Sequence, residues 1–137
     1  MNKILEKAQW IMDPEFHGLT PINVFHKELE DPDLPEHRED LKNHHMLVRK
    51  NFELNDTIEK GKIYITADDY YKLYINGKFV GQGPAPSYYF NYYYNCFDIS
   101  DYLQPGRNLI AVHVYYQGLI NRVWNSGDYR QGMMAEL

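Results

Sequence analysis

The sequence is poor in cysteine and has neither a long apolar run nor an excess of positive charge. The one cysteine, Cys96, excludes an internal disulfide framework. Because Cys96 lies in an apolar, aromatic run, we expect a small buried thiol rather than a reactive one. No apolar run approaches the roughly 20 residues of a membrane helix, so no membrane contact is expected. The N-terminus has no signal-peptide pattern, which favours a cytoplasmic location.

Acidic residues are concentrated at the start of the chain. Residues 1–43 contain ten acidic and five basic residues, whereas residues 44–137 contain nine of each. Nucleic acid requires a basic face, so no nucleic-acid partner is expected. Residues 13–43 also contain four prolines, which favour an irregular arm with at most a short helical turn near Pro35–Lys42. We therefore expect one domain overall, with an N-terminal strand plus acidic arm at 1–43 and a body at 44–137.

Motifs for catalysis are missing. The sequence shows no Ser-His-Asp order, no glycine-rich phosphate loop and no CxxC motif. The pair His44-His45 lacks a third metal ligand at a typical spacing, and His113 is expected to be a hydrogen-bonded core or interface histidine. Asp68-Asp69 is the only paired acid in the body, and we expect a solvated strand end there. The alternative is a pair of calcium ligands, which would be the only cofactor site.

Tyrosine and alternating apolar residues are abundant instead. The chain has 13 tyrosines, and aromatics make up 15% of it, a composition that suits half-buried strands. Alternation predicts a short edge strand at Lys7–Met12, with Trp10 pointing to the core, and longer strands in the body. The second face of the strand at 107–116 is also apolar, which predicts a central position in a sheet. The predicted body strands lie at 44–54, 62–68, 71–75, 78–81, 90–97, 107–116 and 130–137.

Turn residues separate these strands. Asn76-Gly77 supplies the positive φ angles of a tight hairpin turn, and Gly106 is also expected to need special backbone geometry. Asp98–Leu103 predicts one helical turn capped by Asp98 or Ser100. Short strands at regular spacing with little helix predict an all-β fold of two packed sheets, a β-sandwich.

The aromatic tract between Tyr88 and Phe97 has two possible roles. Its tyrosines can form a platform on which a sugar ring stacks, while nearby asparagines bind the sugar hydroxyls. Alternatively, they fill the core, pair across strands or bury against a neighbouring domain. The candidate sugar-binding residues are Tyr88, Tyr89, Asn91, Tyr92, Trp124 and Asn125.

The order of these motifs resembles a known family. Residues Ala67–Gly118 resemble the N-terminal domain of bacterial α-L-rhamnosidases of glycoside hydrolase family 78. The matching segments are a hairpin, a proline-containing loop, an aromatic strand, a D-hydrophobic-S-x-x-L turn and a P-G-x-N strand start, at Tyr71–Gly81, Gly83–Tyr89, Asn91–Phe97, Asp98–Leu103 and Gln104–Val112. Trp10-Ile11 and Arg49–Phe52 are similar to motifs that precede them. The jelly-roll domains of β-galactosidases and β-glucuronidases share part of this pattern.

The resemblance implies a jelly-roll β-sandwich of the galactose-binding-domain type, carried by an inverting rhamnosidase. The catalytic acids of such enzymes lie on a separate (α/α)₆ barrel, so no catalytic residue is carried over to this chain. The chain ends inside the apolar strand QGMMAEL, which favours a domain cut from a longer polypeptide. The sequence departs from the family pattern in two loops. The family often has P-G-W-T where Pro86 is followed here by Ser87, Tyr88 and Tyr89, and G-x-G-W where this chain has Gln117-Gly118-Leu119-Ile120. Both departures remove a tryptophan from a loop in which it would meet sugar.

Three functions follow from this interpretation. The first is a non-catalytic accessory domain that packs on the catalytic domain of the same chain, with rhamnose-containing glycans as the candidate ligands. The second is an autonomous carbohydrate-binding module. The third is the N-terminal jelly roll of a β-galactosidase-like enzyme. Exposed, coplanar aromatics would favour the second, and an apolar patch would favour the first.

Overall fold

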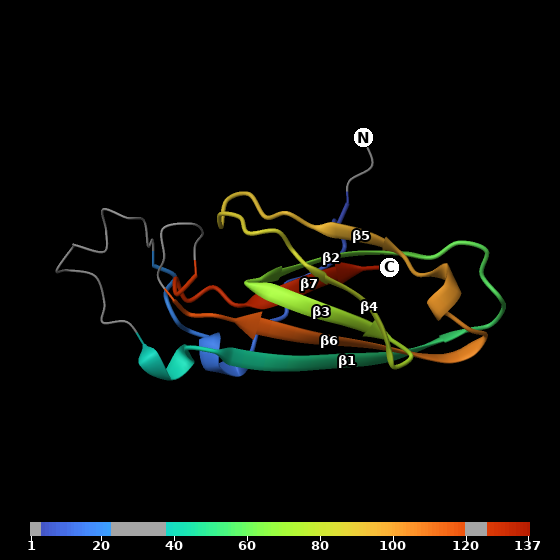
Figure 1. Cartoon of the computed structure of the whole chain (residues 1–137), viewed down its shortest axis with the longest axis horizontal. Coiled ribbons are helices and arrows are strands. Elements are labelled where there is room, and N and C mark those ends of the chain that lie inside the picture. Colours follow the sequence, from blue (N-terminus) through green and yellow to red (C-terminus); the bar gives the residue numbers. More distant parts are fainter. Residues whose placement is uncertain (1–3, 23–37, 120–125) are drawn as a thin grey trace.

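The computed structural model describes residues 4–22, 38–119 and 126–137, and seven strands form its framework (Figure 1). In the described residues, helical structure is limited to the 3-10 turns η1 (Pro14–Phe16), η3 (Glu39–Leu41) and η4 (Ser100–Tyr102). The strands are β1 (His44–Leu54), β2 (Lys62–Asp68), β3 (Tyr70–Ile75), β4 (Lys78–Gly83), β5 (Asn95–Asp98), β6 (Gly106–Tyr116) and β7 (Gly132–Glu136).

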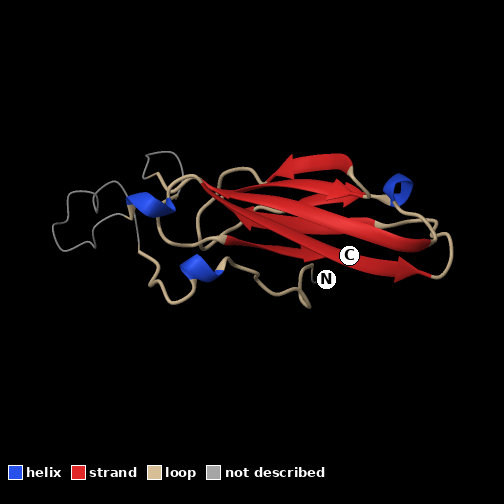
Figure 2. Cartoon of the chain, turned by 90° about the horizontal axis from the view of Figure 1, so that it is seen from below, coloured by secondary structure: helices blue, strands red, loops and turns tan. Residues whose placement is uncertain are grey.

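Two antiparallel sheets pack face to face, which confirms the predicted β-sandwich (Figures 1 and 2). One sheet has the order β1-β6-β3-β4, and the other has the order β5-β2-β7. β6 lies between β1 and β3, so its predicted central position is confirmed. The jelly-roll detail of the fold stays a prediction.

Alternation along the strands builds the core between the sheets. Even-numbered residues of β6 such as Val112 and Val114 point inward, as do odd-numbered residues of β2 and β3. The main inward side chains are Met46, Ile63, Ile65, Leu73, Ile75, Val112 and Val114. On the opposite face of β1, Leu47 is 80% exposed, because a strand that covers the core with one face leaves the other to solvent.

The hairpin between β3 and β4 has the geometry that its sequence favours. Asn76 and Gly77 have φ angles of 49° and 78°, and Ile75 pairs with Lys78. The helical turn is also present: η4 is preceded by Asp98, whose Oδ1 accepts hydrogen bonds from the Ser100 amide at 3.0 Å and from its hydroxyl at 2.6 Å. Gly106 has a φ of 82°.

The N-terminal segment differs from its prediction. Of the edge strand expected at Lys7–Met12, the structure shows one bridge, in which Ile11 and Met133 exchange two backbone hydrogen bonds of 2.8 Å. Trp10 is 42% exposed, so its expected place in the core is wrong. Adjacent side chains alternate across a bridged segment, and the segment runs along the sheet rim rather than between the sheets.

The arm is anchored on both sides of its undescribed part. Phe16 and Leu41 are buried and form a second small core with Tyr116 and Tyr129. η3 lies within the segment for which a helical turn was predicted. Residues 35–37 of that predicted turn, and residues 23–34 of the predicted irregular arm, lie outside the described residues.

The aromatic strand is shorter than predicted, and its cysteine is exposed. β5 begins at Asn95 because it pairs with β2 only from Lys62 to Ile65. Asn95 and Phe97 face inward, so Cys96 between them points outward on an edge strand. The expectation of a buried thiol is therefore wrong: an apolar surrounding sequence does not decide which face of a strand a residue occupies.

Candidate functional site

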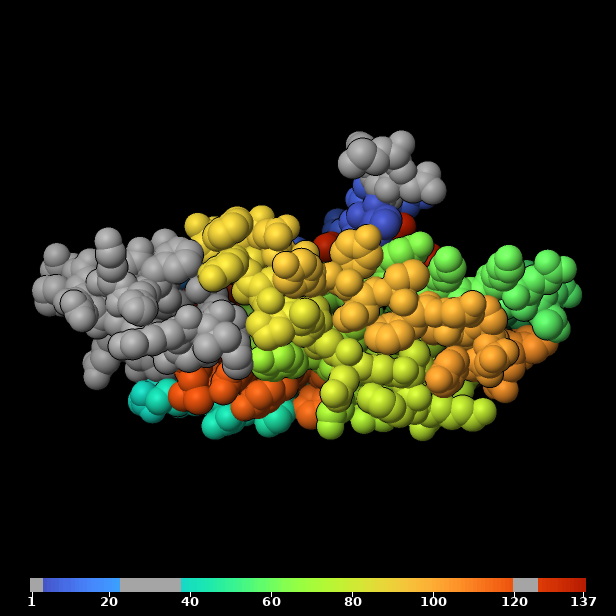
Figure 3. All heavy atoms as spheres, turned by 45° about the horizontal axis from the view of Figure 1, so that its top comes forward, coloured from blue at the N-terminus to red at the C-terminus, as the bar shows by residue number. Residues whose placement is uncertain are grey.

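The aromatic loop, residues Tyr88–Tyr94, projects from the sandwich between β4 and β5 (Figure 3). Its backbone folds back on itself, since the Asn91 amide donates to the Tyr88 carbonyl at 2.9 Å. The Tyr88 and Phe90 rings are parallel at 5.4 Å, whereas the Tyr89 ring is at 86° to the Phe90 ring. Tyr88 and Tyr89 are therefore close to perpendicular, and they do not form the coplanar pair expected of a flat sugar platform.

A concave site lies beside this loop, and we call it the aromatic hollow. Its volume is about 340 Å³. It joins the N-terminal segment, the end of β2, the aromatic loop and the segment that leads into β7. Its lining consists of Trp10, Met12, Phe16, Leu19, Pro21, Asp68, Tyr89, Tyr92, Tyr129, Arg130 and Gln131.

Aromatic rings and one guanidinium form the walls of the aromatic hollow. The Trp10 and Tyr92 rings lie 5.1 Å apart at an angle of 56°. The Arg130 guanidinium carbon lies 4.1 Å from the centre of the Tyr89 ring, a cation–π contact. Arg130 Nη1 also donates to Asp128 Oδ2 at 2.7 Å, which fixes the guanidinium at the rim.

Asp68 contributes a buried carboxyl to the aromatic hollow. It is 6% exposed, and its Oδ2 accepts a hydrogen bond from the Tyr92 hydroxyl at 2.5 Å. Burial raises the pKa of Asp68 well above its ordinary value, and the neighbouring carboxyl of Asp69 raises it further. Burial and the charge of Asp68 also raise the pKa of Tyr92. Asp68 is therefore harder to ionise than an exposed aspartate.

Asp69 is held by hydrogen bonds from Gln117 and Ser126. Its Oδ2 accepts hydrogen bonds from the Gln117 amide at 2.7 Å and from the Ser126 hydroxyl at 2.5 Å. Burial raises the pKa of Asp69, although these donors oppose the shift. The solvated strand end predicted for Asp68-Asp69 is therefore wrong, because both carboxyls are enclosed by segments that are distant in the sequence.

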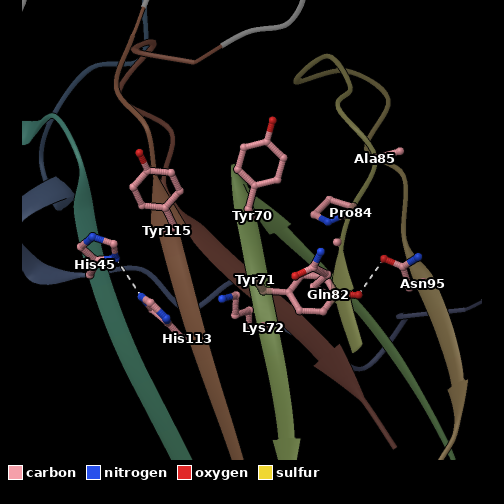
Figure 4. A pocket seen from close by; sticks show the side chains of 11 residues that line it. His45, Tyr70, Tyr71, Lys72, Gln82, Pro84, Ala85, Asn95, His113 and Tyr115 are labelled. Carbon is pink, nitrogen blue, oxygen red and sulfur yellow. Dashed lines mark hydrogen bonds between the residues drawn. The ribbon is translucent and has the colours of Figure 1, made fainter. Parts of the chain in front are cut away.

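A second concave site, the sheet hollow, lies on the outer face of the four-stranded sheet (Figure 4). Its volume is about 590 Å³. His45 Nδ1 and His113 Nε2 are hydrogen-bonded at 2.8 Å. His113 is therefore hydrogen-bonded, as expected, but it lies on the outer face of the sheet and not in the core. The lining residues are His45, Tyr70, Tyr71, Lys72, Gln82, Gly83, Pro84, Ala85, Asn95, His113 and Tyr115.

The structure brings together only part of the predicted sugar-binding set. Tyr89 and Tyr92 line the aromatic hollow, whereas Tyr88 and Asn91 lie outside its lining. Trp124 and Asn125 are outside the described residues. Sequence reasoning missed Trp10, which it assigned to the core, and Arg130. The Asp128-x-Arg130 spacing after Gly127 was the available signal for a charged pair on a turn.

No group of three or more histidine, cysteine or carboxylate side chains in the described part of the chain is arranged to hold a metal ion. Calcium at Asp68 and Asp69 stays a prediction. His44 and His45 point to opposite faces of β1. His44 Nε2 lies 3.2 Å from Asp13 Oδ2, whereas the His45 ring contacts His113. Among the residues with defined positions, no helix is long and apolar enough to span a membrane.

The fold and its hollows define a small β-sandwich module with an aromatic surface site. The family model for the α-L-rhamnosidase N-terminal domain matches residues 56–135. The chain belongs to this family, and the resemblance noted in the sequence is confirmed. A search of curated proteins finds no match.

Solved structures of two rhamnosidases are similar to the chain. A family 78 rhamnosidase of Bacillus sp. GL1 is 37% identical with a TM-score of 0.63, over 69% of this chain and 10% of that one. The α-L-rhamnosidase of Aspergillus terreus is 28% identical with a TM-score of 0.59, over 75% of this chain and 13% of that one.

A different class of glycosidase shares the fold. A calcium-binding mutant of Bacteroides uniformis β-glucuronidase 2 is 25% identical with a TM-score of 0.50, over 71% of this chain and 12% of that one. The chain thus spans about a tenth of the length of each of these enzymes.

Proposed function

We propose that the chain is the non-catalytic N-terminal accessory domain of an α-L-rhamnosidase-like glycoside hydrolase, and that its aromatic hollow contacts a rhamnose-containing glycan. The observation that carries the proposal is the combination, in one hollow of a domain of this family, of the Trp10 and Tyr92 rings with the Arg130 guanidinium and the Asp68 carboxyl.

This combination suits a sugar. The apolar C–H face of a deoxy sugar packs against an aromatic ring, and its hydroxyls need donors and acceptors at the edge of that ring. Trp10 offers an exposed ring, and the Arg130 guanidinium supplies donors at the rim. The Asp68 carboxyl supplies an acceptor, and it also donates when it is protonated.

The packing role has its own support. A groove of about 560 Å³ opens between the edge strands β1 and β7 and is mostly apolar. Its apolar lining includes Ile11, Val48, Phe52, Ile110, Ala135 and Leu137. We propose that the catalytic domain of the same chain covers this groove, because an apolar opening at a sheet edge gains stability when another surface excludes water from it.

Calorimetric titration of the 137-residue protein with L-rhamnose and rhamnosylated oligosaccharides tests the sugar proposal. We expect saturable binding that Trp10→Ala weakens about tenfold, the effect of losing a stacked ring. Phe79→Ala is the matched control, because Phe79 is 51% exposed and contacts Tyr74 rather than the hollow. Titrations with calcium and with a chelator test the predicted metal at Asp68 and Asp69.

Two outcomes would change the conclusion. Silence across the panel from a folded sample would reject sugar contact and leave the packing role. Equal weakening by Trp10→Ala and Phe79→Ala would reject the aromatic hollow as the site.

The second candidate function is the N-terminal domain of a β-glucuronidase-like or β-galactosidase-like enzyme, which the similarity to β-glucuronidase 2 favours. The parent polypeptide distinguishes the two: an (α/α)₆ barrel downstream supports a rhamnosidase, and a (β/α)₈ barrel supports the alternative.

A further inference from the structure

The sheet hollow is built from side chains on the outward face of β1, β6 and β3. His45, His113 and Lys72 occupy neighbouring positions on these three strands, since His113 pairs directly with Lys72 in the register of β6 and β3. Gln82 and the segment Gly83–Ala85 form the opposite wall (Figure 4). The site therefore lies on regular strands, whose side chains keep fixed relative positions.

Basic side chains gather in the sheet hollow, and no acid is part of its lining, although the charge of Asp69 reaches Tyr70. Its lining contains one lysine and two histidines, and neither Asp nor Glu. Among the outward residues of the four strands, Glu53 is the only acid, and it pairs with Arg107 at the other end of β1. Burial lowers the pKa of His113, and the neighbouring His45 and Lys72 lower it further. An anion placed among these groups would relieve their repulsion.

The groups that face His113 come from every adjacent strand. β1 contributes His45 and Arg49, β3 contributes Tyr70, Lys72 and Tyr74, and β6 itself contributes Tyr115. None of them is acidic. The hydrogen bond between the two imidazoles needs one N–H donor and one bare nitrogen acceptor, so the pair keeps its bond with one added proton and loses it with two.

Aromatic rings border these basic side chains. The Tyr70 and Tyr115 rings are 6.5 Å apart and nearly parallel at 18°, and the His45 ring stacks on Tyr115 at 4.9 Å. Figure 4 shows both tyrosines standing on the same side of the sheet above the two histidines. Rings beside a cation, with the Gln82 amide opposite, suit a ligand with an apolar face, hydroxyls and one negative group.

We propose that the sheet hollow binds a carboxylated monosaccharide, with the carboxylate between Lys72 and His113 and the sugar ring against Tyr70. This is a second ligand site, separate from the aromatic hollow. Only the choice of a sugar as the carrier of the carboxylate rests on the proposed function; the preference for an anion follows from the strands themselves.

NMR titration of the histidine ring protons against pH tests this site with D-glucuronate as the probe. A bound carboxylate stabilises the protonated imidazole, so the pKa of His113 should rise by about one unit, equivalent to roughly tenfold tighter binding of the protonated form. D-glucose, which has the same ring without the carboxylate, should leave the pKa unchanged. Glucuronate affinity should increase as the pH falls through the imidazole range.

Variants locate the effect. Lys72→Gln should weaken glucuronate binding about tenfold, whereas Lys78→Gln, the same charge change at the turn end of the hairpin, should leave it unchanged. No pKa change with glucuronate would overturn the proposal. An equal change with acetate would overturn the sugar part, and an equal loss in both lysine variants would overturn the location. The linings of the two hollows share no residue, so failure of L-rhamnose to bind and failure of glucuronate to bind report on different sites.

Discussion

The Tyr92 hydroxyl donates a hydrogen bond to the Asp68 carboxyl across 2.5 Å and so ties the aromatic loop to the end of β2. The bond spans 24 residues of sequence, and the same Tyr92 ring contacts Trp10 of the N-terminal segment. The loop and the N-terminal segment therefore depend on the same buried carboxyl for their positions.

Removal of this hydroxyl is expected to destabilise the fold. Tyr92→Phe keeps the ring but leaves a buried oxygen of Asp68 without its donor, which costs about 1–3 kcal/mol. Urea unfolding measures the loss. Tyr93→Phe is the control, because Tyr93 is 53% exposed and its variant should give a midpoint close to that of the wild type. Equal midpoints for both variants would contradict the role of the Tyr92 hydroxyl.

The stability of the protein should depend on pH through Asp68. Burial and the adjacent Asp69 raise the pKa of Asp68 in the folded state, so between the unfolded value and the raised one the folded protein binds more protons. Stability from this group therefore falls as the pH rises through that window. Asp68→Asn cannot ionise, so relative to the wild type it should gain stability as the pH rises from the ordinary pKa of an aspartate towards the raised pKa of Asp68. A constant difference in urea midpoint across that range would exclude a shifted Asp68.

The hairpin turn should depend on Asn76 in two ways. Its φ of 49° disfavours β-branched residues, and its side chain donates to Asn108 Oδ1 at 2.9 Å and accepts from the Leu109 amide at 2.9 Å. Asn76→Val loses the favourable backbone conformation and the side-chain hydrogen bonds. It should lower the free energy of unfolding in urea by more than about 3 kcal/mol. Asn76→Gly keeps the backbone angle and loses only the side-chain bonds, so it should cost less. A Val variant as stable as the Gly variant would reject the backbone contribution.

Asn76 also shows which features can be predicted from the sequence and which cannot. The Asn-Gly pair predicts the turn because positive φ is a local property. The bond from Asn76 to Asn108 spans 32 residues and depends on how the hairpin meets β6, which no local pattern contains. Asp68 illustrates the limit again: alternation placed it on a strand, but Ser126, Gln117 and Tyr92, which enclose the Asp68-Asp69 pair, come from distant segments.

Faces were harder to predict than strands. Alternation identifies which residues of a strand share a side, and in β6 Val112 and Val114 share the inward side. Where a strand is short or lies at an edge, the inward side is decided by its pairing partner. Cys96 and Trp10 were misplaced for this reason, and Trp10 became visible as a site residue only through its contact with Tyr92.

The exposure of Cys96 has a direct chemical consequence. An exposed thiol on an edge strand should react with Ellman's reagent in the folded protein, at one equivalent per chain. The reaction is followed by absorbance with and without urea. A reaction that required urea would show that the thiol is buried and that the original sequence expectation was right.

Gly81 and Gly106 should resist substitution for different reasons, which are close packing against the other sheet at Gly81 and backbone conformation at Gly106. A Cβ on Gly81 would lie 2.5 Å and 2.6 Å from Cε1 and Cζ of Phe97, the inward ring of β5. Gly81→Ala should therefore cost about 1–3 kcal/mol by overpacking. Gly106→Ala meets no atom within 4 Å, but its φ of 82° makes any side chain strained, at about 1–2 kcal/mol.

The expected losses of stability from overpacking at Gly81 and from backbone strain at Gly106 overlap in size. A second substitution, at Phe97, distinguishes these two causes. Phe97→Leu removes the atoms that crowd position 81, so it should recover part of the stability lost in Gly81→Ala and none of that lost in Gly106→Ala. A double-mutant cycle in urea unfolding measures this coupling, which should reach about 1 kcal/mol for the Gly81 pair and be close to zero for the Gly106 pair. Equal coupling in both pairs would mean that Phe97 acts on stability in general and that the close approach of β4 to β5 does not limit residue size at position 81.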